Sequence, residues 1–164
     1  MADTATPAVP RWLDDREQAA WRAYLEMNAK LSARLNRDMQ EQSGISSADF
    51  AVLVRLSEHP DGRMRVLELA RALDWEKSRL SHQLTRMGQR GLVERANCTV
   101  DRRGAWIALT EAGQATVEAA APRHVESVRQ YLVDLLEPSQ LDELARIGRT
   151  VIAAVESHCP ESCE

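Results

Sequence analysis

The sequence predicts a mostly α-helical protein of the α+β class, and three observations lead to that prediction. Apolar residues recur every three or four positions along most of the 164-residue chain, as they do on the buried face of a helix. Only two short segments, at residues 92–95 and 105–109, have the composition of strands. With 44% hydrophobic residues, the chain can bury a core without disulfides or a metal ion.

The first long segment is predicted to be a helix over residues 14–42, which follows a disordered N-terminus at 1–12. Its apolar residues, from Trp21 to Met39, keep helical spacing for much of the run. A helix of this length measures about 42 Å, more than a small domain can cover. We therefore expect part of the apolar stripe to pack on a partner chain, and we assign residues 13–45 to dimerisation.

Three shorter helices are predicted next. Ser46, with an acidic residue in the following turn, is typical of a helix N-cap, and the run His59-Pro60-Asp61-Gly62 ends that helix. Helices over residues 66–73 and 76–90 then flank a tight turn. Asp74 occupies the turn position that requires a positive φ, which Asp tolerates better than most residues.

A hairpin and two further helices complete the chain. The polar residues 97–104 separate the two strand-like segments as the tip of the hairpin. Thr110 is a good N-cap for a helix that we expect to continue to about Leu136, with a kink at Pro122. Pro138 begins the last helix, since proline is favoured at the first helical position.

This order of elements is that of a winged helix-turn-helix, which we assign to residues 46–110. In the helix after the turn, Leu80, Leu84 and Met87 have the spacing of inward-facing anchors. The polar residues around them are then left on the outer and flanking faces: Ser78, Arg79, Ser81, His82, Gln83 and Arg86. Such a helix fits a major groove about 12 Å wide and can present donors and acceptors to base edges. The alternative is an amphipathic helix whose polar side only faces solvent.

The charge distribution favours a polyanionic partner. The chain as a whole has a net charge of −4, but residues 63–104 hold ten Lys or Arg against five Asp or Glu, a local net charge of +5. Nine of these ten bases are arginine, whose planar fork of donors suits phosphates and guanine edges. The alternative is a solvated helix face laced with ion pairs.

The residues from Leu69 to Gly113 resemble the MarR family of bacterial transcription regulators. The segment GLVER is followed by Asp-x-Arg in the hairpin tip (Asp101 and Arg103) and then by LT-x-x-G, which ends at Gly113. The flanking helices extend the resemblance from about Leu13 to about Ser157.

The resemblance implies an obligate homodimer that binds double-stranded DNA through two winged motifs. Residues 13–45 would interlock with the helices of residues 111–158, which we assign to dimerisation as well. The implied function is transcriptional regulation, most often repression that ends when a small-molecule effector, commonly an aromatic acid or a phenol, enters the cleft between the dimerisation and DNA-binding parts.

We assign contacts of the recognition helix with DNA to Lys77, Ser78, Arg79, Ser81, His82, Gln83 and Arg86. The side chains at the start of the helix should meet phosphates or the first bases. His82 and Gln83 are the candidates for base edges, since Gln can bind adenine through two hydrogen bonds. Arg86 should hold a phosphate, which adds affinity without sequence information.

The hairpin tip supplies the second set of expected contacts. Arg103 resembles the arginine that enters a narrow minor groove in this family. Asp101 would orient it, or would form an Asx turn instead, and Arg102 is a solvated charge or a phosphate contact. The chain departs from the family pattern at Leu67, where many members have Ser or Thr, and at Trp75-Glu76-Lys77, which replaces a smaller polar start of the recognition helix.

Other classes of function find little support. The sequence has no GxGxxG or GxxxxGK[ST] motif and no set of nucleophile, base and acid, so we predict neither an enzyme nor a bound cofactor or metal ion. No apolar run approaches the length of a membrane span, so we expect no association with a membrane. The N-terminus lacks an apolar signal core, so we expect a cytoplasmic location.

Three cysteines leave a redox or metal role open. Cys98 lies near the hairpin tip and could sense oxidants or be an inert thiol. Cys159 and Cys163, with His158, either form a small metal cluster or belong to a frayed tail at residues 159–164. Besides an oxidation-sensing regulator, the remaining alternative is a dimer whose winged motif contacts protein rather than DNA.

Overall fold

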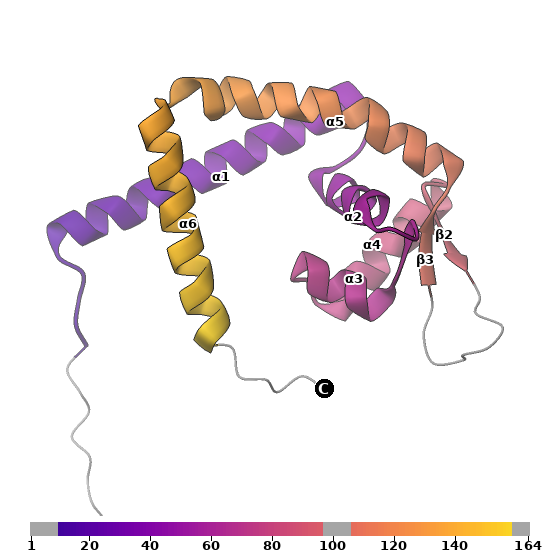
Figure 1. Cartoon of the computed structure of the whole chain (residues 1–164), viewed down its shortest axis with the longest axis horizontal. Coiled ribbons are helices and arrows are strands. Elements are labelled where there is room, and N and C mark those ends of the chain that lie inside the picture. The colour runs from indigo at the N-terminus through magenta and orange to yellow at the C-terminus, as the bar shows by residue number, and fades with distance from the viewer. Residues whose placement is uncertain (1–9, 97–105, 159–164) are drawn as a thin grey trace, which may run out of the picture. The chain divides into compact units, whose positions relative to one another are not determined.

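The computed structural model describes residues 10–96 and 106–158 of the chain. Residues 1–34 and 35–164 form two compact units, and each is described by itself. Figure 1 shows the elements, which are α1 (Asp15–Ser43), α2 (Ser47–Glu58), β1 (Arg63–Arg65), α3 (Val66–Leu73), α4 (Lys77–Gln89), β2 (Val93–Ala96), β3 (Trp106–Leu109), α5 (Glu111–Tyr131), the 3₁₀-helix η1 (Val133–Leu135) and α6 (Pro138–His158). The prediction of a mostly α-helical fold of the α+β class, with strands in a hairpin, is confirmed.

The first unit contains the N-terminal part of α1. The helix begins with a reciprocal cap, in which the Glu17 backbone N–H donates to the Asp14 carboxylate at 2.8 Å and the Asp14 N–H donates to Glu17 at 2.9 Å. Trp21 and Tyr24, one turn apart, stack with ring centroids 5.6 Å apart. Both side chains are about half exposed, so the apolar stripe of this part of α1 is open to contact in the single chain.

The turns between α2, α3 and α4 follow the sequence prediction. Ser46 caps α2 as expected: its hydroxyl accepts from the Asp49 backbone N–H at 3.0 Å, and the Asp49 carboxylate accepts from the Ser46 N–H at 2.9 Å. Asp74 adopts a φ of +53° at the end of α3, the left-handed conformation predicted for that position. The helix-turn-helix geometry therefore depends on an aspartate where glycine would be unstrained.

The sheet has three antiparallel strands in the order β1-β3-β2. The hairpin strands β2 and β3 were predicted, whereas β1 was not. Met64 in the centre of β1 pairs with Ile107 of β3, and both side chains are buried. A strand of three residues is too short to show an alternating pattern, so its sequence contains no signal that could be read in advance.

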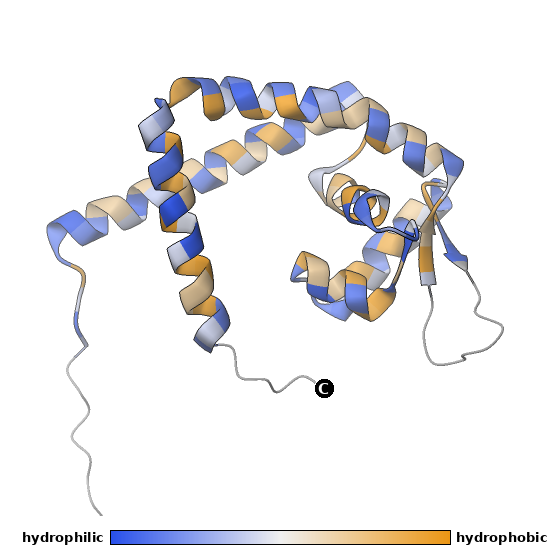
Figure 2. Cartoon of the chain, viewed as in Figure 1, coloured by the Kyte–Doolittle hydropathy of each residue, from blue (hydrophilic) through white to orange (hydrophobic). Residues whose placement is uncertain are grey.

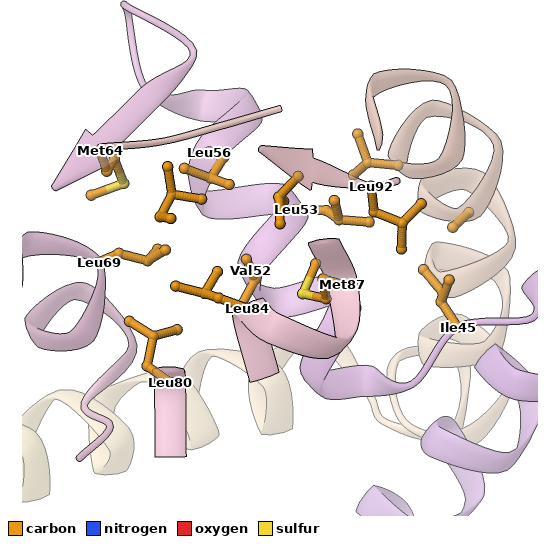
Figure 3. Packing of buried hydrophobic residues seen from close by; sticks show 14 of the residues in the cluster. Ile45, Val52, Leu53, Leu56, Met64, Leu69, Leu80, Leu84, Met87 and Leu92 are labelled. Carbon is orange, nitrogen blue, oxygen red and sulfur yellow. The ribbon is translucent and has the colours of Figure 1, made fainter. Parts of the chain in front are cut away.

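The core of the second unit lies where α2, α3, α4 and the sheet meet, as Figure 3 shows. Its largest fully buried side chains are Val52, Leu53, Leu56, Leu69, Leu80, Met87 and Ile107. The predicted anchors of α4 are confirmed, because Leu80, Leu84 and Met87 are all buried. Burial of one such side chain contributes about 1.5–3 kcal/mol, so these three residues fix which face of α4 turns outward.

The C-terminal helices differ from the prediction in one respect. The helix that begins after Thr110 ends at Tyr131 rather than near Leu136. Leu132 leaves the helical region with φ −141° and ψ −62°, and a short 3₁₀ turn follows. The expectation of one continuous helix to Leu136 is therefore wrong, and no glycine or proline in the sequence marks this end.

Helix α6 has no buried residue in the single chain. Figure 2 shows apolar and polar residues alternating along its length. Its exposed large apolar residues are Leu144, Ile147, Val151, Ile152 and Val155. No helix among the described residues is both long enough and apolar enough to cross a membrane.

The first turn of α5 approaches the end of the turn before β2 very closely. A Cβ atom built on Gly113 would lie 2.0 Å from the Leu92 carbonyl oxygen and 3.1 Å from its carbonyl carbon. Two hydrogen bonds join the same segments: the Thr110 backbone N–H donates to the Leu92 carbonyl at 3.3 Å, and the Thr110 hydroxyl donates to the Gly91 carbonyl at 2.6 Å. Glycine at position 113 is therefore a steric requirement of this contact.

We predict that Gly113→Ala lowers the free energy of unfolding by about 3 kcal/mol or more, because the new methyl group overlaps a backbone carbonyl that cannot rotate away. Chemical denaturation measures the loss. The matched control is Gly88→Ala in α4, whose Cβ would be in ordinary van der Waals contact, 3.8 Å from the Val93 carbonyl oxygen; this change should raise stability by about 0.5–1 kcal/mol through helix propensity. Equal stability of Gly113→Ala and the natural chain would contradict the proposed contact.

Candidate nucleic-acid interface

The outer face of α4 carries most of the residues that the sequence singled out. Lys77, Ser78, Arg79, His82 and Arg86 are exposed, and Ser81 is partly buried. Within the described part of the chain, no hydrogen bond or ion pair involves the side chains of Lys77, Ser78 or His82. These donors and acceptors are therefore available to a partner, on a helix whose opposite side is anchored in the core.

Gln83 was predicted to lie on the outer side of the helix and to read base edges, and this prediction is wrong. It is buried, with only 4% of its surface exposed. Its amide nitrogen donates to Asp49 Oδ1 at 2.5 Å, and its amide oxygen accepts from Arg86. Because both ends of the amide are bound inside the protein, Gln83 supports the helix instead of facing a ligand.

Asp49 is the centre of the polar network that joins α4 to α2. Its carboxylate caps the start of α2, accepts from Gln83, and forms an ion pair with Arg90 at 2.8 Å. Arg90 also donates to the Gly44 carbonyl at 2.8 Å. Only 6% of the Asp49 side chain is exposed, so these hydrogen bonds form away from bulk water. The sequence identified Asp49 only as the acidic residue in the first turn of the helix and gave no sign of its contacts with α4.

The start of α4 has an aromatic platform. The Arg79 guanidinium carbon lies 4.3 Å from the centroid of the Trp75 ring. Trp75 is half-buried and packs against the core cluster. The spacing of four residues between Trp75 and Arg79 could have indicated this contact, which the sequence analysis did not consider.

A second aromatic platform lies in the sheet, at the base of the hairpin. The guanidinium groups of Arg63 and Arg65 lie 5.1 and 5.0 Å from the centroid of the Trp106 ring. This contact joins β1 to β3 on the side of the sheet opposite the buried Met64. It places two further cations next to the hairpin whose tip was expected to contact DNA. Asp101, Arg102 and Arg103, as well as Cys98, lie outside the described residues.

A polar cluster between α1 and α5 is separate from this face. The Ser127 hydroxyl donates to Asp38 at 3.1 Å, and both residues are buried. His124 lies nearby with its ring 4.9 Å from that of Phe50, and partial burial lowers the pKa of its imidazole below the usual value. His124 is therefore mainly neutral at pH 7. No group of three potential metal ligands occurs among the residues that the structure describes.

Together, a helix-turn-helix with an anchored second helix and a following β-hairpin define a winged helix-turn-helix protein. The MarR family model matches residues 45–104. The solved structure of AbsC, a MarR family transcriptional regulator from Streptomyces coelicolor, is 45% identical, with coverage of 91% of this chain and 100% of AbsC and a TM-score of 0.85. Sco3205 from the same organism, another MarR family regulator and solved in complex with DNA, is 38% identical, with coverage of 94% and 95% and a TM-score of 0.86.

A curated relative gives the same result. The transcriptional repressor MdtR of Bacillus subtilis is 28% identical over 120 residues, which are 73% of this chain and 76% of MdtR. The chain belongs to the MarR family of transcriptional regulators.

We predict that Asp49→Ala lowers the free energy of unfolding by about 2–4 kcal/mol, because it removes a helix cap and leaves Gln83 and Arg90 without their shared acceptor. Asp49→Asn keeps the shape of the side chain but loses its charge, so its free energy of unfolding should lie between those of Asp49→Ala and the natural chain. Asp142→Ala, at an exposed position of α6, is the control. Urea denaturation provides the measurement, and a loss no larger than that of the control would show that the network contributes nothing.

Proposed function

We propose that this regulator binds double-stranded DNA by placing the outer face of α4 in the major groove. The observation that carries the proposal is the row of exposed polar and basic side chains on α4, opposite the buried anchors. The net charge of +5 over residues 63–104 adds long-range attraction to phosphates. Three similar proteins, Sco3205, a MarR variant from Escherichia coli and MepR from Staphylococcus aureus, have structures described as complexes with DNA.

The roles of individual residues form part of this proposal. Lys77 and Ser78 at the start of α4 contact phosphates, where the positive end of the helix dipole assists them. His82, one turn further on, remains the candidate for a base edge, and Gln83 is withdrawn from that role. Arg86 binds a phosphate while its other side supports Gln83. In the hairpin tip, Arg103 enters the minor groove, Asp101 orients it, and Arg102 contacts a phosphate or solvent.

The proposed binding unit is a homodimer. The exposed apolar residues of α6 and of the N-terminal part of α1 are too numerous for a surface that faces water only. A second copy of the chain covers such faces symmetrically, and a two-fold dimer then presents two α4 helices to a pseudo-palindromic site with half-sites about 10 bp apart.

The proposed mode of regulation is repression that a small molecule relieves. Curated relatives include the repressors MdtR of Bacillus subtilis and MprA of Escherichia coli. An aromatic acid or a phenol would release the protein from the operator if it bound more tightly to a dimer conformation whose α4 helices do not match the spacing of the two half-sites than to the conformation that does. A difference in binding free energy of a few kcal/mol between the two dimer conformations is sufficient to shift the population.

We predict that affinity for duplex DNA falls steeply with salt, because each neutralised phosphate releases counterions.

We also predict that Arg103→Ala weakens binding to a selected operator by about 1–3 kcal/mol. Arg129→Ala is the control, since Arg129 lies in α5 and is paired with Asp134. Fluorescence anisotropy at several salt concentrations provides the measurement, and the addition of benzoate or phenol to the same complex tests release. Binding without salt dependence would favour a winged motif that contacts protein.

We predict that Val151→Glu weakens the dimer at least tenfold, because it introduces a charge into the apolar face of α6. Arg149→Glu introduces the same side chain two positions away, on the polar side of the helix, and should leave the dimer intact. Sedimentation equilibrium measures the association. A monomeric natural chain, or equal effects of the two variants, would contradict the proposed interface.

A further inference from the structure

The contact between Trp75 and Arg79 places a guanidinium against an aromatic face at the start of α4. The Arg79 guanidinium carbon lies 4.3 Å from the centroid of the Trp75 ring, and the Arg79 side chain is exposed. Within the described part of the chain, no hydrogen bond or ion pair occupies this guanidinium. Its only described partner is therefore an aromatic face, which restricts its position without using its N–H donors.

The backbone of Trp75 is itself held in place. Asp74 adopts its left-handed conformation at the end of α3, and this allows the Trp75 N–H to donate to the Ala70 carbonyl at 2.9 Å. Trp75 then lies one residue before the cap of α4, and Leu80 is the fourth residue of that helix. Apolar residues at these two positions form a hydrophobic staple, which fixes the direction in which the chain enters the helix. The ring packs against the core cluster, which restricts its movement.

Stacking has a chemical consequence for Arg79. The tryptophan ring attracts the guanidinium through its π face, and a contact of this kind uses none of the five N–H donors as a hydrogen bond. A planar fork held in this way matches two neighbouring acceptors, such as O6 and N7 of guanine in the major groove. Residues near the N-terminus of a recognition helix include those that reach base edges. The neighbouring Lys77 is a point charge on a flexible stem and suits a phosphate better.

We propose that Arg79 reads a guanine in the operator and that Trp75 is the positioning residue that holds its guanidinium for this contact. This inference rests on the proposed function, because it requires that the outer face of α4 enters the major groove. It assigns a role to Trp75, to which the proposed function gives none. It also assigns one sequence preference of the operator to a named pair of side chains.

The test is a selection of binding sites from a random-sequence duplex DNA library. The proteins compared are the natural chain, Arg79→Ala, Arg79→Lys, Trp75→Leu and Trp75→Phe, each first shown by thermal unfolding to be folded. A second measurement uses the selected duplex with 7-deazaguanine at each guanine in turn, since this base lacks the N7 acceptor.

In the sites selected by Arg79→Ala and Arg79→Lys, we expect the preference for guanine to be lost at one position of each half-site. Replacing that guanine by 7-deazaguanine should weaken the natural protein about 10-fold or more, but should leave Arg79→Ala unchanged. Trp75→Leu should reduce the discrimination about 2- to 5-fold while Trp75→Phe retains most of it, because phenylalanine preserves an aromatic face. The base preferences at the other positions of the DNA site should be the same in the natural chain, Trp75→Leu and Trp75→Phe.

Three results would overturn the inference. An unchanged guanine preference in Arg79→Ala would show that Arg79 does not read a base. A uniform loss of affinity across all sequences, with a shallower salt dependence, would identify Arg79 as a phosphate contact. Equal discrimination by Trp75→Leu and the natural chain would remove the positioning role. If the natural chain selects no sequence at all, the proposed function itself is wrong, so the two failures can be told apart.

Discussion

The orientation of the recognition helix depends on one buried carboxylate. Asp49 caps α2, accepts from Gln83 of α4, and pairs with Arg90 just beyond the end of α4. Apolar packing alone would allow α4 to rotate or slide by small amounts, because hydrophobic contacts have little directional preference. Hydrogen bonds from two separate turns to one carboxylate remove this freedom. The side chains on the opposite face of α4 are thereby presented in a fixed register.

Backbone constraints at both ends of the motif complete the arrangement. At the start of α4, the left-handed Asp74 sets the position of Trp75 and thus of the guanidinium stacked on it. At the start of α5, Gly113 allows the helix to touch the Leu92 carbonyl, where any side chain would clash. The first position sets the start of α4, and the second joins the base of the hairpin to the helix that follows it. The turn residues of this fold therefore fix the distances between the elements that are proposed to contact DNA together.

Much of this could be predicted from the sequence, because the relevant signals are local. Caps such as Ser46 and Thr110, the positive φ of Asp74 and the inward spacing of the α4 anchors all depend on residues within one or two turns. Gln83 was misplaced for the opposite reason. Its helical position is compatible with either face, and its burial is decided by Asp49, which lies 34 residues earlier in the sequence.

The same distinction explains the other differences. The strand β1 exists only through its pairing with β3 more than 40 residues away, and three residues cannot show a period. The end of α5 at Tyr131 lacks a glycine or proline signal, since the break lies in the dihedral angles of Leu132. The stacking of Trp75 with Arg79 is local, and a search for aromatic and arginine pairs four residues apart would have found it.

The interactions expected from the charge distribution and from the exposed apolar faces depend differently on salt concentration. Residues 63–104 carry a net charge of +5, whereas the rest of the chain carries −9. A polyanion is therefore attracted to the winged motif and repelled by the remainder, which orients the protein during approach over about one Debye length, roughly 10 Å at 0.1 M salt. Association through the apolar face of α6, as proposed for the dimer, would not weaken with salt in this way. High salt should therefore separate the proposed dimer from DNA without dissociating it, which makes association and DNA binding independently measurable in one protein.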